Sequence, residues 1–189
     1  MDTDPSELGQ DQAIRVAERL RSTPFHCIYS SPLKRALHAA NAIAASQNLD
    51  VQIDEDLTEI DHGAWNGLLR EEVEQRYGAL LQAWFATPGR VKMPGGESLE
   101  EVRRRSRRAI DRVLARHEGQ TVALCSHNAV LKVMIADLLD IGLDQFWAIA
   151  VDNASISIME FTDGRPCLTV MNDTCHLGSR HSKQNERAL

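Results

Sequence analysis

Two short apolar runs, each closed by serine and followed at once by a helical repeat, constrain the fold of this chain most. Residues 26–30 lead through Ser31 into one helical pattern, and residues 121–125 lead through Ser126-His127 into another. Strand–turn–helix units of this kind build mostly parallel sheets. Ligands of such sheets bind beyond the carboxyl ends of the strands. We therefore predict an α/β fold with Arg35 and His127 at one rim.

Hydrophobic periodicity and turn residues predict that helices and strands alternate along the chain. Ser31 is the expected N-cap of its helix, with Pro32 at the first helical position. Ser98 and Glu101 form an expected capping box, and the Asp163-Gly164 pair predicts a hairpin turn. The expected helices cover 9–21, 32–44, 68–77, 79–85, 98–117 and 128–139, and the expected strands cover 26–30, 51–53, 121–125, 154–161 and 166–172. We expect one domain over 1–177 and a polar, disordered tail over 178–189.

Composition excludes some classes of function. The chain of 189 residues carries a net charge of −6, which argues against a nucleic-acid partner. Its start is acidic without an apolar stretch, and no run is long enough to span a membrane, so we predict a cytoplasmic protein without a membrane partner. Four cysteines lack paired spacing, which predicts reduced thiols and no metal site. The arginine run 103–108 could bind nucleic acid, but we favour the solvated face of the capped helix.

Three side chains are candidates for chemistry, and each also has a plainer explanation. Arg35 follows a helix start, where backbone amides and a guanidinium favour an anion, or it is a surface arginine. His127 follows an apolar strand and opens a helix, or it is a core histidine held by the backbone. Glu59 lies in a turn-rich segment and could be a solvated loop carboxylate.

Three motifs occur in order, and together they resemble the histidine phosphatase superfamily, also called phosphoglycerate mutase-like. They are IYSSPLKRA at 28–36, LTEIDHGAWNG at 57–67 and VALCSHNAV at 122–130, and DPSELGQDQA at 4–13 adds a weaker likeness. The resemblance implies a three-layer α/β/α domain with a mostly parallel sheet. It also implies hydrolysis of phosphomonoesters through a phosphohistidine, without metal or other cofactor.

The resemblance assigns roles to four residues. Arg35 is the second arginine that clamps phosphate. Glu59 is the general acid that protonates the leaving alkoxide and then the base that activates water. His127, in its protonated form, stabilises charge on the phosphoryl group, and Asn128 stands where the family often has glycine, beside the bound phosphate. Trp65 is expected to pack, and His62 is expected to be exposed without a role.

The sequence departs from the family at one decisive point. The family opens with a strand that ends in Arg-His-Gly and supplies the nucleophile, and this tripeptide is absent here. The resemblance makes that strand a central one, so its absence would leave ladder groups unpaired on both neighbours. We therefore expect the printed chain to be inactive.

Three functions follow from the resemblance. The first is a phosphatase of small phosphorylated metabolites, of the alpha-ribazole or sugar phosphate type. The second is a catalytically dead, phosphate-binding regulator, and the third is a phosphoglycerate mutase. The segment between Glu59 and His127 is shorter than mutases usually carry, which favours the phosphatase. A homodimer is left open.

Overall fold

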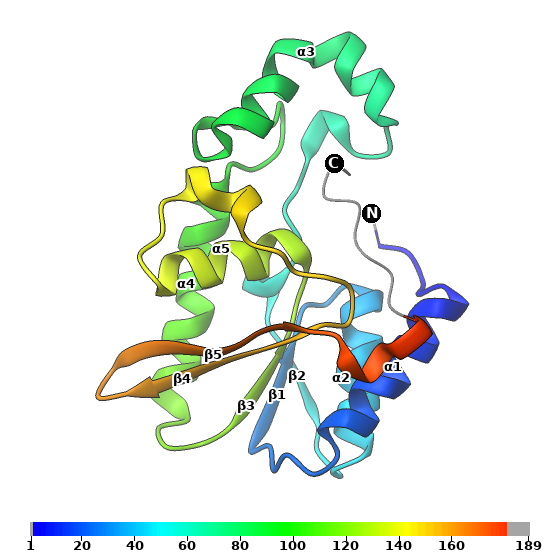
Figure 1. The fold of residues 1–189 in the computed structure, drawn as a ribbon, viewed down its shortest axis with the longest axis vertical. Coiled ribbons are helices and arrows are strands. Elements are labelled where there is room, and N and C mark those ends of the chain that lie inside the picture. The colour runs from blue at the N-terminus through cyan, green and yellow to red at the C-terminus, as the bar shows by residue number, and fades with distance from the viewer. Residues whose placement is uncertain (1, 181–189) are drawn as a thin grey trace.

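The computed structural model describes residues 2–180 and has a mixed α/β fold (Figure 1). Three parallel strands form a sheet in the order β2-β1-β3, with bounds Cys27–Ser30 for β1, Val51–Ile53 for β2 and Val122–Cys125 for β3. Ile28 of β1 is in register with Val51 on one side and Ala123 on the other. The strands β4 (Ile156–Thr162) and β5 (Arg165–Asp173) form a separate antiparallel hairpin. The predicted α/β class and parallel pairing are confirmed.

The two faces of β1 contact different helices, which gives the expected three layers. Ile28 packs with α1 (Glu7–Leu20) and α2 (Lys34–Ala45), whereas Tyr29 faces the opposite cluster with α4 (Leu99–Arg116) and α5 (Asn128–Leu138). All four β1 residues are buried, as a central strand between helical layers requires. The unpaired ladder groups expected beside a missing strand do not occur at β1, which is paired on both sides. That expectation stays a prediction for β3, an edge strand among residues 2–180.

The start of α2 differs from the prediction. Ser31 is not its N-cap, because the helix begins at Lys34 and Leu33 occupies the capping position without a side-chain bond. The Ser31 hydroxyl accepts instead from the Leu33 N–H at 3.2 Å, in a local turn before the helix. Asp2 Oδ1 accepts from the Lys34 N–H at 2.8 Å and so takes over the capping role.

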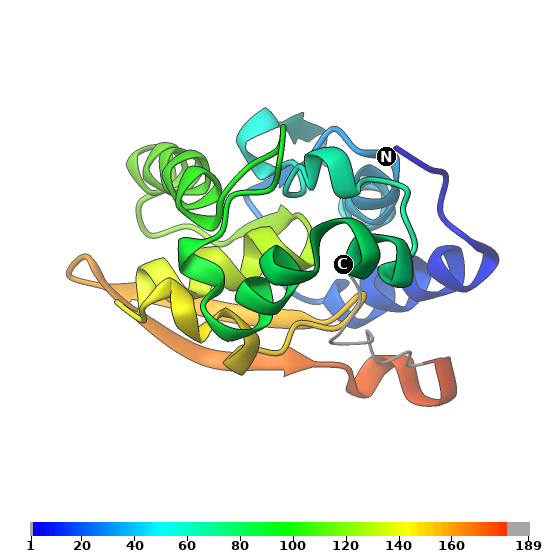
Figure 2. The same cartoon turned by 90° about the horizontal axis from the view of Figure 1, so that it is seen from above.

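The segment expected to form two helices forms one kinked helix. α3 runs Arg70–Ala86 and has non-helical backbone angles at Tyr77. It lies at the end of the molecule toward which the three parallel strands point, and Figure 2 looks down on that end with α3 nearest the viewer. No helix among residues 2–180 is long and apolar enough to cross a membrane.

Most remaining expectations are confirmed locally. Ser98 and Glu101 form the predicted capping box of α4. Asp163 and Gly164 both have positive φ, at 52° and 73°, as a type I′ hairpin turn requires. A 3-10 helix covers Cys175–Arg180, and the rest of the expected disordered tail lies outside the described residues, so that expectation stays a prediction. The other 3-10 helices are Glu55–Leu57, Gly63–Trp65, Pro88–Arg90 and Leu143–Ala148.

Candidate active site

The ends of β1 and β3 meet through Ser31 and His127. The Ser31 N–H donates to the Cys125 carbonyl at 3.0 Å, which continues the ladder past the last paired residues. The Ser31 hydroxyl lies 2.8 Å from His127 Nε2, and both side chains are buried. Ser126 donates to the Leu57 carbonyl at 2.7 Å and ties the segment that carries Glu59 to the same rim. The two serine-bearing turns therefore form one site, as the sequence predicts.

Glu59 lies at the first turn of α5. Its Oε1 accepts from the Ile60 N–H at 3.0 Å. Burial raises the pKa of the Glu59 carboxyl, and this effect exceeds the lowering by the Ile60 N–H, by Arg35 and by the N–H groups of Ala129 and Val130. A carboxyl with a raised pKa is suited to donating a proton near neutral pH. The surrounding amides and cation are also the groups that would hold an anion.

Arg35 and His127 share this rim, as predicted. The Arg35 guanidinium lowers the pKa of both Glu59 and His127, so its charge acts on both groups. Burial is the larger cause at His127, and with Arg35 and Arg105 it lowers the pKa of the imidazole to about 3. His127 is therefore neutral near pH 7 in this structure. Burial and two guanidinium groups thus oppose the protonated His127 that we expected, and its charge beside a bound phosphate stays a prediction.

The backbone of Asn128 belongs to the site, whereas its side chain bonds to a residue elsewhere. The residue opens α5, where the first backbone N–H groups have no partner within the helix. Its side-chain amide donates to the Val151 carbonyl. The expected contact of Asn128 with phosphate stays a prediction.

Sequence reasoning missed Arg105, whose charge lowers the pKa of His127. We expected it on a solvated face, but its side chain is 12% exposed. It binds both carboxylate oxygens of Glu97, at 2.8 and 3.0 Å, and the Asp56 carbonyl at 2.8 Å. The available signal was helical spacing, since Arg105 adjoins Ser106 in the buried stripe of α4. The other arginines of the run are more exposed and mostly pair with acidic side chains.

The segment after Glu59 is held by packing. Trp65 is 1% exposed, so its predicted packing role is confirmed. The expectation that His62 is exposed is wrong. Its ring packs edge-on against Trp84 at 6.4 Å, burial lowers its pKa, and its Nδ1 is enclosed without a hydrogen-bond partner among the described residues.

The sequence comparison decides the family. A model of the histidine phosphatase superfamily (branch 1) matches residues 1–174. The chain belongs to this superfamily.

Relatives in sequence and in structure agree with that membership. The chain is 40% identical over 178 residues to phosphoserine phosphatase 1 of Hydrogenobacter thermophilus, which covers 94% of this chain and 84% of that protein. The solved structure of Bacillus stearothermophilus YhfR superimposes with a TM-score of 0.87 at 28% identity, over 93% and 91% of the two chains. The solved structure of a mycobacterial glucosyl-3-phosphoglycerate phosphatase in complex with inorganic phosphate superimposes with a TM-score of 0.86 at 28% identity, over 93% of this chain and 90% of that chain.

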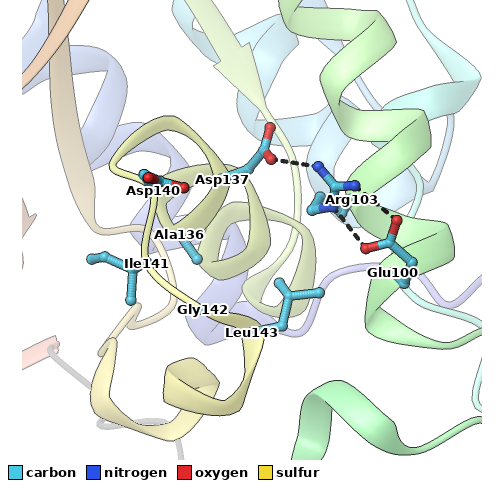
Figure 3. Close-up of a pocket in the computed structure, with 8 residues that line it drawn as sticks. All are labelled: Glu100, Arg103, Ala136, Asp137, Asp140, Ile141, Gly142 and Leu143. Atoms are coloured by element: carbon cyan, nitrogen blue, oxygen red, sulfur yellow. Dashed lines mark hydrogen bonds and ion pairs between the residues drawn. The ribbon is translucent and has the colours of Figure 1, made fainter.

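A pocket between α4 and the far end of α5 does not suit the anion that a histidine phosphatase must hold. Figure 3 shows Arg103 between Asp137 and Glu100, with Nη1 2.9 Å from Asp137 and Nε 2.7 Å from Glu100. Three carboxylates, those of Glu100, Asp137 and Asp140, outnumber the one guanidinium, so phosphate would be repelled. α5 is 11 residues long, which separates this pocket from His127 by about 16 Å along the helix.

Proposed function

We propose that this chain binds phosphomonoesters of small metabolites and supplies most of a phosphatase site. The observation that carries the proposal is the convergence of Arg35, His127 and Glu59 at the amino end of α5. Arg35 and the amino-terminal N–H groups of that helix favour a phosphoryl group. His127 donates to the same group and stabilises its charge as the bond to the leaving oxygen breaks.

Glu59 is the general acid and base in this proposal. Its raised pKa keeps the carboxyl protonated closer to neutral pH than an exposed glutamate. A protonated Glu59 can give its proton to the leaving alkoxide, and the resulting carboxylate can then activate water. The same carboxylate accepts from the amides of α5, so an entering phosphoryl group competes with it for those donors.

The covalent route needs a histidine nucleophile besides His127. The printed sequence has no Arg-His-Gly to supply it, and His127 Nε2 is bonded to Ser31. We therefore propose that the printed chain binds phosphate without turnover, which keeps the binding-only function as the second candidate. A relative named phosphoserine phosphatase favours hydrolysis over mutase chemistry and makes O-phosphoserine the first substrate to test.

Hydrolysis and binding together test this proposal. The printed chain, and a chain extended through any in-frame codons upstream of Met1, are assayed with p-nitrophenyl phosphate and O-phosphoserine in the presence of a chelator. Only a chain that gains an Arg-His-Gly is expected to turn over. Rapid turnover by the printed chain would show that another group is the nucleophile.

Calorimetric titration with phosphate or vanadate separates binding from turnover. We expect the printed chain to bind weakly and Arg35→Ala to abolish binding. Arg104→Ala is the matched control, because Arg104 is 63% exposed and pairs with Glu100 on α4. An equal loss of phosphate affinity in Arg35→Ala and Arg104→Ala, or no binding by the unaltered chain, would refute the proposed phosphate site.

A further inference from the structure

Ser31 is a fully buried polar residue that the mechanism above does not use. Its relative exposure is 0%. Its hydroxyl oxygen lies 2.8 Å from His127 Nε2 and accepts from the Leu33 N–H at 3.2 Å. Ser31 and His127 come from the ends of two paired strands, and the bond from Ser31 N–H to Cys125 fixes their spacing.

Counting protons and lone pairs decides the direction of the bond between them. A serine hydroxyl has one proton to donate and can accept two hydrogen bonds. If neutral His127 carried its proton on Nε2, Ser31 would accept from both Nε2–H and Leu33 N–H. Its own proton would then lack an acceptor, because the structure gives Ser31 Oγ no third partner among residues 2–180. A buried donor without a partner is costly, which disfavours this tautomer by about tenfold or more.

The alternative leaves every group paired. Ser31 donates its proton to Nε2, and the imidazole proton then resides on Nδ1. If His127 becomes charged, Nε2–H donates to Ser31 and Nδ1 keeps its proton. Nδ1 is therefore an N–H donor in both states.

We propose that Ser31 is a positioning residue that sets the tautomer of His127, so that the imidazole donates Nδ1–H to the bound phosphoryl group. The last clause rests on the proposed function. Such a donor is needed because His127 is neutral near pH 7 in this structure. With the proton on Nε2, Nδ1 would turn a lone pair toward the anion and repel it. Ser31 thus lets a neutral histidine stabilise negative charge.

Nitrogen NMR of the imidazole reads the tautomer directly and needs no turnover. Long-range proton–nitrogen spectra of ¹⁵N-labelled protein, with the His127 signals assigned by their loss in His127→Gln, are recorded across neutral pH. We expect the Nδ1–H tautomer in the unaltered protein, a shift toward Nε2–H in Ser31→Ala, and recovery in Ser31→Thr. Ser126→Ala is the matched control, because that hydroxyl is adjacent in sequence but donates to Leu57.

If Ser31→Ala does not fold, the spectrum of the unaltered protein still decides the question. An Nε2–H tautomer of His127 in the unaltered protein would overturn the proposal. An unchanged His127 spectrum in folded Ser31→Ala would also overturn it. Vanadate titration then tests the donation, with affinity expected to fall about tenfold or more in Ser31→Ala. A changed tautomer with unchanged vanadate affinity would refute the donation. Absence of vanadate binding in the unaltered protein would instead count against the proposed function, while the tautomer is judged from the spectra.

Discussion

Replacing Gly63 by alanine should be one of the most damaging methyl additions in this protein. A Cβ on Gly63 would lie 2.3 Å from the Pro94 carbonyl oxygen and 2.4 Å from the Gly96 nitrogen, and Gly63 also has a φ of +54°. A Cβ on Gly96 would lie 2.3 Å from the Asp61 carbonyl oxygen, at a φ that is not left-handed. Gly95 has a φ of +70° with nothing within 4 Å of its Cβ position. The three glycines thus separate backbone strain from steric clash.

The expected losses of unfolding free energy follow from these differences. Gly95→Ala carries only the left-handed backbone cost of roughly 1–2 kcal/mol. Gly96→Ala carries only the clash, about 1–3 kcal/mol or more because the opposing atoms are backbone. Gly63→Ala carries both, about 2–5 kcal/mol in total. All three share the same small gain of roughly 0.4–1 kcal/mol from a stiffer unfolded chain, so their order is unaffected.

Urea unfolding of the three variants measures these losses, with thermal unfolding as a second readout. A protein of this size loses about 2–4 °C in Tm per kcal/mol, so Gly63→Ala should melt roughly 4–20 °C lower. The Gly95→Ala and Gly96→Ala losses together should fall short of the Gly63→Ala loss by one unfolded-chain gain of roughly 0.4–1 kcal/mol, because their sum counts that gain twice. A Gly95→Ala loss as large as that of Gly63→Ala would refute the assignment of the cost to the close approach of the two turns.

Three further results are expected. Glu59→Gln should slow hydrolysis about 10²–10⁴-fold in any turnover-competent form, measured with p-nitrophenyl phosphate, and a change under threefold would remove Glu59 as the acid. The hydrogen bond from Lys92 and those from Ser98 lower the pKa of Glu101 from 4.5 to about 2, so its stabilisation is present above pH 4.5 and lost as pH falls toward 2. In Glu101→Gln, the urea midpoint of unfolding should therefore depend less on pH between 4.5 and 2 than in the unaltered protein. An equal pH dependence in the two proteins would contradict this. Burial raises the pKa of Cys125 to about 12, whereas Cys167 is exposed, so iodoacetamide should label Cys167 much faster than the partly buried Cys125 in peptide mass spectra, and equal rates would contradict this.

Features set by near neighbours in sequence could be predicted, and features set by distant partners could not. The capping box of α4 depends on two residues three positions apart, and the hairpin turn depends on adjacent residues. The start of α2 was misplaced because its cap comes from Asp2, far away in the chain, while the Ser31 hydroxyl contacts Leu33 and His127. Arg105 looked like its neighbours in the run, and only its partner Glu97 distinguishes it.

The protonation state of the site was also beyond sequence reasoning. Sequence placed Arg35 and His127 at one rim correctly. It could not show that burial and a second guanidinium act on the same imidazole, and so it favoured a charged His127. His62 was misjudged for the same reason, because its burial comes from Trp84 on another element.

The strand order has a consequence for the time course of folding. β1 reaches β2 through a single helix, so these strands and α2 can form one local unit early. β3 completes the other side of β1 only after α3 and α4 have been synthesised and the long segment has closed. Contacts between residues distant in the chain form late and slow the folding of a domain. Ser31 follows β1 and His127 follows β3, so the site forms only when these two strands pair. In a refolding experiment, the site should therefore appear in the last and slowest step, after most of the helical circular-dichroism signal has returned.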